Sequence, residues 1–280
     1  MKTIAFVLLM TLCAATMAAA NDAASGNAWE KAALAAQHEA AASAPHSPFA
    51  TTDCAFPFST GTGDTLLKYC VTANGNIVQL ETPQGAEHVA VGTIGEGYGV
   101  CDLNSDTGYF DYAGFGDSGW GPAKLVKQTA TSVKIARTTT DGIFTLTQTI
   151  TEVPGTLPWI KLSMTLKNNS AVARDAFLIR YVDVDADGVA KNNFDTTEDS
   201  AFAWNSLGSF AGFGLVVQNV GQGAVVINTL TQFQAAGPDP CNPVFNLHLL
   251  TNTDGSLGLE YLVELGKGAS TTVNTTYRGM

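Results

Sequence analysis

The sequence predicts an all-β protein, a large antiparallel β-sandwich, and three observations support this fold class. Apolar and polar residues alternate with a period of two in many short segments after Thr51. Turn dipeptides such as Asn74-Gly75, Asp141-Gly142 and Asp254-Gly255 separate those segments. No comparable helical stretch follows Ala50, so a βαβ architecture is not expected.

The first twenty residues, Met1–Ala20, have the pattern of a secretory signal peptide. Lys2 supplies the positive end, Ile4–Ala15 supplies a short apolar run, and Ala18-Ala19-Ala20 supplies a small-residue cleavage site. The apolar run is too short to span a membrane, and no later run is long enough. We therefore expect the mature chain, Asn21–Met280, to be secreted or periplasmic.

An Ala-rich leader, residues 21–50, follows the signal peptide. Its composition is compatible with one helix that Pro45 and Pro48 end, or with a flexible segment. Cleavage of the leader and docking of the leader on the body both stay open. The β-sandwich domain is predicted to span residues 51–280.

The clearest predicted strand is Pro158–Lys167, in which Ile160, Leu162, Met164 and Leu166 alternate with polar residues. Asp141-Gly142 separates two more strands and predicts a hairpin between them. The predicted strands other than Pro158–Lys167 are, in chain order, Leu66–Thr72, Asn76–Thr82, His88–Thr93, Thr131–Thr138, Ile143–Thr151, Ala176–Val184, Gly214–Val220, Ala224–Thr229, Phe245–Leu250, Leu259–Leu265 and Thr271–Tyr277.

Four cysteines remain after removal of the signal peptide: Cys54, Cys70, Cys101 and Cys241. An even number in an exported chain favours two disulfides, for which three pairings exist. The first two cysteines are close enough in sequence to bridge a strand pair, so we favour Cys54–Cys70 with Cys101–Cys241. Neither a CxxC motif nor the Cys/His spacing of zinc sites is present, which argues against a thiolate metal site.

The whole chain has a formal net charge of −11. This balance argues against nucleic acid or anionic lipid as a partner, because both need clustered Lys or Arg. Charged residues make up 14% of the chain, and Thr, Asn, Ser and Gly fill the expected surface instead. An acidic surface can also hold cations if its carboxylates converge.

An acidic segment, Tyr181–Gly188, resembles the first half of a calcium loop. Asp183, Asp185 and Asp187 alternate along it, and Gly188 permits a sharp turn. The twelfth position of an EF-hand would be Phe194 instead of glutamate, so a site would need Asp195 or another acid from a folded-back loop. The sequence thus leaves two readings open: a Ca²⁺ site at Asp183, Asp185, Asp187 and Asp195, or a strand end with solvated acids.

The same carboxylates also permit a catalytic interpretation. If the strand continues through Asp185, this residue and Asp183 share one face and could act as an acid/base or glycosidase pair. Such pairs usually come from different strands, so the spacing alone is a weak signal.

The segment Gly95–Pro122 interleaves aromatic residues with acids and eight glycines. Aromatic rings stack on the C–H faces of sugars, and carboxylates accept sugar hydroxyls, so the composition suits a carbohydrate-binding rim. The alternative is a long loop whose rings seal one end of the sandwich. We expect Tyr112 and Trp120 to be the exposed, ligand-binding rings.

The absence of several catalytic motifs argues against common enzyme classes. Nucleophile-elbow, zinc-hydrolase, phosphate-loop and dinucleotide motifs are all missing from the sequence. His88 and His248 are the histidines of the predicted domain, and each is expected to make structural hydrogen bonds within a strand.

The closing stretch, Leu259–Arg278, forms two strands around Gly266-Lys267-Gly268. Together with the large strand count, this pattern is similar to the supersandwich of galactose-mutarotase-like proteins. The likeness implies a fold and transfers no catalytic residue.

Three hypotheses of function follow from the sequence. The first is a secreted β-sandwich that binds a glycan or a cell-envelope partner, with loops that Ca²⁺ stabilises. The second is a carbohydrate-active enzyme, a hydrolase, lyase or epimerase, that uses Asp183, Asp185 and His248. The third is a structural or adhesive subunit that assembles through edge strands.

Overall fold

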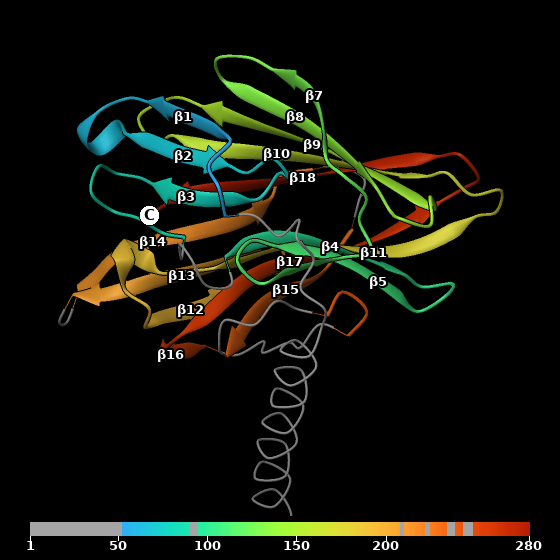
Figure 1. The fold of residues 1–280 in the computed structure, drawn as a ribbon. Coiled ribbons are helices and arrows are strands. Elements are labelled where there is room, and N and C mark those ends of the chain that lie inside the picture. Colours follow the sequence, from blue (N-terminus) through green and yellow to red (C-terminus); the bar gives the residue numbers. More distant parts are fainter. Residues whose placement is uncertain (1–51, 90–94, 208–209, 222–224, 234–238, 243–248) are drawn as a thin grey trace, which may run out of the picture. The chain divides into compact units, whose positions relative to one another are not determined.

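Three antiparallel β-sheets form the regular structure of the described residues in the computed structural model (Figure 1). These residues are 52–89, 95–207, 210–221, 225–233, 239–242 and 249–280, and they belong to one compact unit, Ala44–Met280. The predicted signal peptide and leader lie outside them. Within these ranges, no helix is long and apolar enough to cross a membrane.

The largest sheet has nine strands in the order β16-β12-β13-β14-β18-β10-β9-β8-β7. In that order the strands are Leu250–Thr253, Asn192–Thr196, Ser200–Leu207, Phe210–Asn219, Ser270–Gly279, Trp159–Asn168, Phe144–Val153, Ser132–Thr138 and Lys124–Gln128.

The second sheet has six strands in the order β15-β17-β11-β4-β5-β6, and the third has three in the order β1-β2-β3. The six strands are Val225–Phe233, Gly255–Leu265, Arg174–Asp183, Glu96–Asp102, Thr107–Tyr112 and Gly116–Ser118. The three are Phe56–Thr60, Leu67–Val71 and Ile77–Glu81, and two short 3₁₀ turns are η1, Gly63–Thr65, and η2, Ala186–Gly188.

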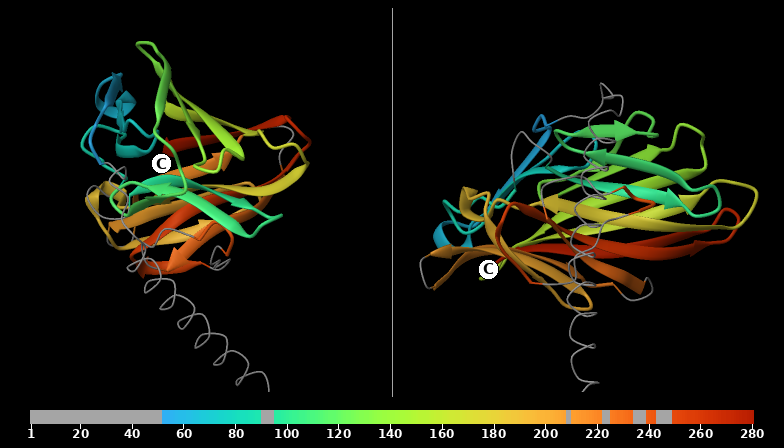
Figure 2. Two further views of the ribbon diagram at one scale, coloured as in Figure 1. Left: turned by 45° about the vertical axis from the view of Figure 1, so that its right-hand side comes forward. Right: turned by 90° about the horizontal axis from the view of Figure 1, so that it is seen from below.

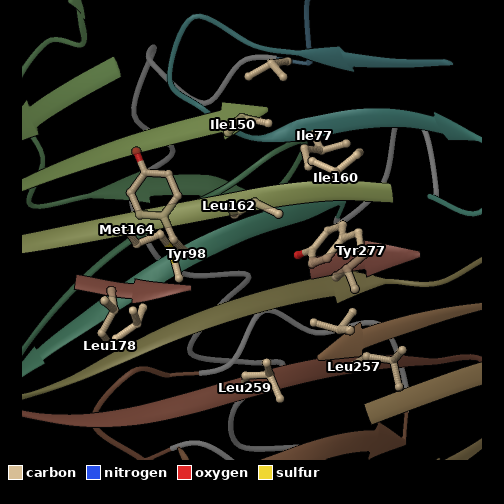
Figure 3. Packing of buried hydrophobic residues seen from close by; sticks show 14 of the residues in the cluster. Ile77, Tyr98, Ile150, Ile160, Leu162, Met164, Leu178, Leu257, Leu259 and Tyr277 are labelled. Carbon is tan, nitrogen blue, oxygen red and sulfur yellow. The ribbon is translucent and has the colours of Figure 1, made fainter. Parts of the chain in front are cut away.

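The nine-stranded and six-stranded sheets pack face to face, as the turned views show (Figure 2). Leu162 and Met164 of β10 meet Leu178 of β11 and Leu259 of β17 between the sheets, and all four are at most 1% exposed (Figure 3). Ile77 of β3 belongs to the same cluster, so the three-stranded sheet extends the core. The predicted all-β sandwich is confirmed.

Both predicted disulfides are present. Cys54, just before β1, is bonded to Cys70 of β2, and Cys101 of β4 is bonded to Cys241. The second bond closes a sequence separation of 140 residues and holds the segment 239–242 against β4. Disulfides of this kind are typical of exported proteins.

The Asp141-Gly142 hairpin between β8 and β9 is also confirmed. Gly142 has a φ of 75°, which a side chain would disfavour. The Asp141 carboxylate accepts hydrogen bonds from the Thr139 hydroxyl at 2.6 Å and the Ile143 N–H at 3.0 Å. The side chain of Asp141 therefore satisfies polar groups of the turn itself, and the turn sets the register between β8 and β9.

The alternative interpretation of Gly95–Pro122 as a long loop is wrong, because most of this segment forms β4, β5 and β6. Its glycines permit close approach of chain segments within a sheet. A Cβ at Gly97 would lie 2.0 Å from the Asp111 carbonyl oxygen, and one at Gly99 would lie 2.9 Å from the Tyr112 hydroxyl. Glycine here therefore marks crowded strands instead of a flexible loop.

Several other strands were not expected from the sequence. They include β1, β7, β12, β13 and β16, while most of the predicted strands His88–Thr93 and Phe245–Leu250 lies outside the described residues. The core-facing positions of β13 are Ala201 and Ala203, which give a weak hydrophobic alternation. Strands with small inward residues are therefore not recognised from the alternation of apolar and polar residues.

A buried ion pair joins Arg180 of β11 to Glu96 of β4, and both side chains are fully buried. The Glu96 carboxylate also accepts hydrogen bonds from the Tyr277 hydroxyl at 2.7 Å and the Ile77 N–H at 2.6 Å. Arg180 in turn donates to Gln148 Oε1 at 2.5 Å. Because Tyr277 and Gln148 belong to the nine-stranded sheet and Ile77 to the three-stranded sheet, this network connects all three sheets.

The turn between β2 and β3 forms hydrogen bonds with the same network. Arg180 donates to the Gly75 carbonyl at 3.2 Å, and the Asn76 amide donates to the Glu96 carbonyl at 3.1 Å. Asn74 donates to the Asp111 carboxylate at 2.8 Å. The Asn-Gly-Asn turn therefore supplies partners for charges that would otherwise be buried alone.

A second buried arginine, Arg137 of β8, pairs with Asp111 of β5 and with Asp117 of β6. Its guanidinium also donates to the Tyr98 hydroxyl at 3.2 Å and lies 5.8 Å from the centre of the Trp120 ring. This pair connects the nine-stranded sheet to the far edge of the six-stranded sheet.

Removing the charge of Glu96 is expected to destabilise the protein strongly. In Glu96→Gln the buried Arg180 charge loses its counter-ion, which costs about 3–5 kcal/mol. Lys68→Gln, which breaks the surface pair of Lys68 with Glu81, is the control and should cost less than about 1 kcal/mol. Urea unfolding followed by circular dichroism measures both, and equal losses would contradict a central role for the buried pair.

Candidate functional site

Three carboxylates lie near one another at one end of the six-stranded sheet. Asp183 is the last residue of β11 and lies opposite Ser256 of β17. Asp185 follows two residues later, and Asp254 directly precedes β17. The negative charges of Asp185 and Asp254 both raise the pKa of Asp183, as expected for neighbours. We call Asp183, Asp185 and Asp254 the carboxylate cluster.

The three groups differ in their access to water. Asp183 is only 2% exposed, and burial, together with the neighbouring charges of Asp185 and Asp254, raises its pKa to about 9. Asp185 is half-buried and Asp254 is exposed, and burial also raises the pKa of each. Asp183 therefore holds a proton at neutral pH beside a more accessible carboxylate, an arrangement suited to proton transfer.

Backbone hydrogen bonds hold the acidic segment in place. The Asp185 N–H donates to the His88 carbonyl at 3.1 Å, and the Gly188 N–H donates to the Glu87 carbonyl at 3.0 Å. His88 is fully buried, and burial lowers the pKa of its imidazole. Its Nε2 lies 2.6 Å from the Thr82 carbonyl oxygen. His88 thus makes the structural hydrogen bond expected of it, whereas His248 lies outside the described residues.

Several buried polar atoms around η2 have no hydrogen-bond partner among the described residues. They are Asp183 Oδ1, His88 Nδ1, Asn192 Oδ1 and Asn205 Oδ1. The side-chain amide nitrogen of Asn192 donates to the Val184 carbonyl at 2.9 Å, whereas the side-chain oxygen of Asn192 accepts no hydrogen bond from a described residue. Unsatisfied atoms of this kind require a proton, a water molecule or a ligand atom.

The four residues of the predicted Ca²⁺ site are not gathered at one point. Asp187 lies in η2, where it accepts a hydrogen bond from Asn205 at 3.4 Å. Asp195 lies on β12 in the other sheet, opposite Phe202. Asp254, which the sequence predicts only as part of a turn, is the acid that the fold adds beside Asp183 and Asp185.

Among the described residues, the one group of three potential ligands within 4.8 Å of one another is Cys101, Asp106 and Cys241. The disulfide between its two cysteines removes the thiolates that a metal would need. Calcium at Asp183, Asp185 and Asp187 stays a prediction, which a calcium titration of the protein can test.

The expectation that Tyr112 and Trp120 are exposed is wrong. Tyr112 is 1% exposed and Trp120 is 3% exposed. Trp120 packs edge-on against Tyr98 in the sandwich core, and Tyr112 stacks on Phe110 over the six-stranded sheet. Large aromatic rings in a folded domain bury most of their area. Tyr112 and Trp120 are positioned by strand pairing and do not lie in a loop.

Three partly exposed aromatic side chains lie on the side of the nine-stranded sheet that faces away from the six-stranded sheet. We call this side the outer face. Trp159 of β10, Phe202 and Trp204 of β13 are half-buried there, while Ile160 of β10 points into the core. The rings of Phe202 and Trp204 are 6.2 Å apart, and Gly214 lies opposite Trp204 with no side chain.

Hydroxyl groups line the middle of the outer face. Thr147, Thr149 and Thr151 of β9 alternate with core residues and are half-buried. Such alternate residues stand about 6.6–6.8 Å apart along a strand. The neighbouring strands add hydroxyl and amide pairs, such as Ser163 with Asn274 at 2.7 Å. The outer face therefore presents regularly spaced hydrogen-bonding groups beside aromatic rings.

Comparison with known proteins reveals a shared fold without sequence similarity. No protein-family model matches the chain, and no curated protein matches its sequence. A bacterial glucoamylase solved with acarbose superposes with a TM-score of 0.59 at 9% identity, over 84% of this chain and 33% of that one. The chain thus spans about a third of the glucoamylase.

Two further solved structures cover 80% of this chain at 10% identity. They are a putative aldose 1-epimerase from Escherichia coli K12, with a TM-score of 0.48 over 99% of its length, and an aldose epimerase homologue from C. elegans, with a TM-score of 0.49 over 98%. The glucoamylase superposition shows that the β-sandwich is a known fold.

The buried carboxyl of Asp183 is expected to make stability depend on pH. Its pKa is raised from 3.8 to about 9 in the folded state. Between these values the unfolded chain releases the proton that the folded chain keeps, so stability falls as pH rises from about 4 to about 9. Asp183→Asn should therefore raise the melting temperature more at pH 8 than at pH 4, as measured by differential scanning calorimetry.

Asp175→Asn, at an exposed residue of β11, is the control and should show no such difference between the two pH values. A gain in Asp183→Asn that is the same at pH 4 and pH 8 would contradict the assignment of a protonated Asp183.

Proposed function

We propose that the protein binds a polysaccharide on the outer face of the nine-stranded sheet. The observation that carries the proposal is the grouping of Trp159, Phe202 and Trp204 on one open sheet face. Flat aromatic surfaces stack on the C–H faces of sugar rings, and an extended sheet face suits an extended chain. This assignment keeps the glycan-binding hypothesis and moves it from Tyr112 and Trp120 to other rings.

Strand pairing supports the grouping. Phe202 lies opposite Val216 of β14, Val216 lies opposite Arg278 of β18, and Arg278 lies opposite Trp159 of β10. Two strands, β14 and β18, therefore lie between the two aromatic positions, which are three strand spacings of about 4.7–4.9 Å apart. A sugar chain that follows this row meets an aromatic ring at each end.

The polar surroundings of the rings also suit sugar hydroxyls. The hydroxyls of Thr147, Thr149 and Thr151 make no side-chain hydrogen bond with another described residue. They are therefore available as donors and acceptors to a ligand. The glucoamylase that shares the fold was solved with acarbose, which is consistent with carbohydrate as the ligand class.

Truncation of Trp204 tests the proposal. Isothermal titration against a panel of purified polysaccharides should identify a ligand, and Trp204→Ala should weaken its binding roughly tenfold or more, because a stacking contact of an aromatic ring is lost. Leu157→Ala, at a residue 68% exposed between β9 and β10, is the control and should bind as the unaltered protein does. Unchanged affinity in Trp204→Ala, or no binding to any polysaccharide of the panel, would refute the proposal.

A second candidate function, a carbohydrate-active enzyme, is favoured by one observation at the carboxylate cluster. Asp183 holds a buried proton beside the more accessible Asp185, so the two could act as acid and base. In this case Asp185→Asn should abolish turnover of a polysaccharide substrate, followed as new reducing ends or unsaturated products, and should leave binding on the outer face unchanged. Absence of turnover by the unaltered protein on every polysaccharide of the panel would eliminate this candidate.

A further inference from the structure

Six of the chain's 14 lysine and arginine residues lie on the outer face. They come from four different strands and are Lys124, Lys127, Lys134, Lys161, Lys167 and Arg278. Four of them are exposed, and Lys134 and Lys161 are half-buried. The acidic chain thus has a basic surface that its net charge of −11 conceals.

Strand pairing brings these cations together. Lys127 of β7 lies directly opposite Lys134 of β8, which lies opposite Thr149 of β9. Lys161 of β10 lies opposite Thr151 in the next row. Like charges directly opposite each other destabilise a sheet, so the pairing of Lys127 with Lys134 is unfavourable unless an anion lies between them.

Among the described residues, the strands around these cations place no acidic side chain on the outer face. The five strands β7, β8, β9, β10 and β18 contain a single acid, Glu152 of β9. Glu152 lies opposite Ile160, a core residue, and is 8% exposed, so it points away from the outer face. Across the sheet, Asp195 of β12 lies beyond the aromatic positions.

The cations also lack internal partners. The buried Arg137 and Arg180, and the surface residues Lys68 and Arg174, form ion pairs with acids. The six cations of the outer face form no ion pair with any described residue. Their charge is therefore available to a ligand.

We infer that the ligand of the outer face is an acidic polysaccharide, and this inference rests on the proposed function. A uronic acid polymer offers a carboxylate to Lys134 and Lys161, hydroxyls to the threonines between them, and a C–H face to Trp159. The lysines, the threonines and the aromatic ring of the outer face then each have a partner group in the same polysaccharide. Charge complementarity on an otherwise acidic protein also orients the polymer toward this face.

Polygalacturonate and its carboxyl-reduced form are matched probes that differ only at C6, where an uncharged hydroxymethyl group replaces the carboxylate. Isothermal titration at low ionic strength should show roughly tenfold tighter binding of polygalacturonate, with a preference that declines as salt is added. In Lys134→Gln/Lys161→Gln this preference should disappear while binding of the carboxyl-reduced polymer stays. Lys134→Arg/Lys161→Arg should retain the preference, because the charge is kept.

Lys191→Gln/Lys267→Gln is the matched control, since it removes the same charge at two exposed residues outside the sheet faces. It should bind polygalacturonate like the unaltered protein. Equal losses in the two glutamine variants would overturn the inference, because they would indicate a general effect of net charge. Tighter binding to single-stranded DNA or to anionic phospholipid vesicles than to polygalacturonate would also overturn it.

The failure of the inference is distinct from the failure of the proposed function. Binding of both polymers with equal affinity, sensitive to Trp204→Ala and insensitive to the lysine substitutions, would retain a polysaccharide ligand and reject an acidic one. Binding of neither polymer, nor of any other acidic polysaccharide in the panel, would reject both.

Discussion

The buried pair of Arg180 and Glu96 is the contact on which the arrangement of the three sheets depends. An unpaired charge in a protein interior is so costly that each of these groups requires a fixed partner. Tyr277, Gln148 and the β2–β3 turn complete the hydrogen bonds of the pair, and each comes from a different part of the chain. The sheets can therefore pack in few other ways without leaving a charge unsatisfied. Hydrophobic contacts alone would not impose this specificity.

The polar network also explains the Asn74-Gly75-Asn76 turn. A turn is normally exposed, yet Asn74 is 6% exposed and Asn76 is fully buried. Its backbone carbonyl and amide groups serve as hydrogen-bond partners for Arg180, Glu96 and Asp111. The three-stranded sheet is thereby fastened to the sandwich by hydrogen bonds to charged groups, which are stronger than those between neutral groups.

The two sheets of the sandwich differ in how their outward sides are used. On the six-stranded sheet, glycines of β4 admit the Tyr112 ring and Pro240, so much of this side is buried. On the nine-stranded sheet, the outer face keeps threonines, lysines and three aromatic rings partly exposed. A side that is already covered leaves little room for a long ligand, whereas an open, regular sheet face suits one. This difference is why the proposed ligand surface is the outer face.

The sequence by itself determined the fold class, most of the longer strands, the Asp141-Gly142 hairpin and both disulfides. These features depend on local alternation, on turn chemistry and on the small number of ways to pair four cysteines. It also identified Asp183 and Asp185 as chemically notable, because their spacing is local. It misjudged Tyr112 and Trp120, since exposure of a ring depends on which strands cover it.

Only the tertiary structure decided which distant residues become neighbours. Asp254 comes beside Asp183 through the pairing of β11 with β17, and Lys127 comes beside Lys134 through the pairing of β7 with β8. Lysines that are far apart in the sequence thus form one basic surface. Phe202 and Trp204 lie on the same face of the sheet, since Ala201 and Ala203 occupy inward positions of β13. The physical reason is that strand register brings together residues far apart in the sequence, and a local pattern contains no information about register.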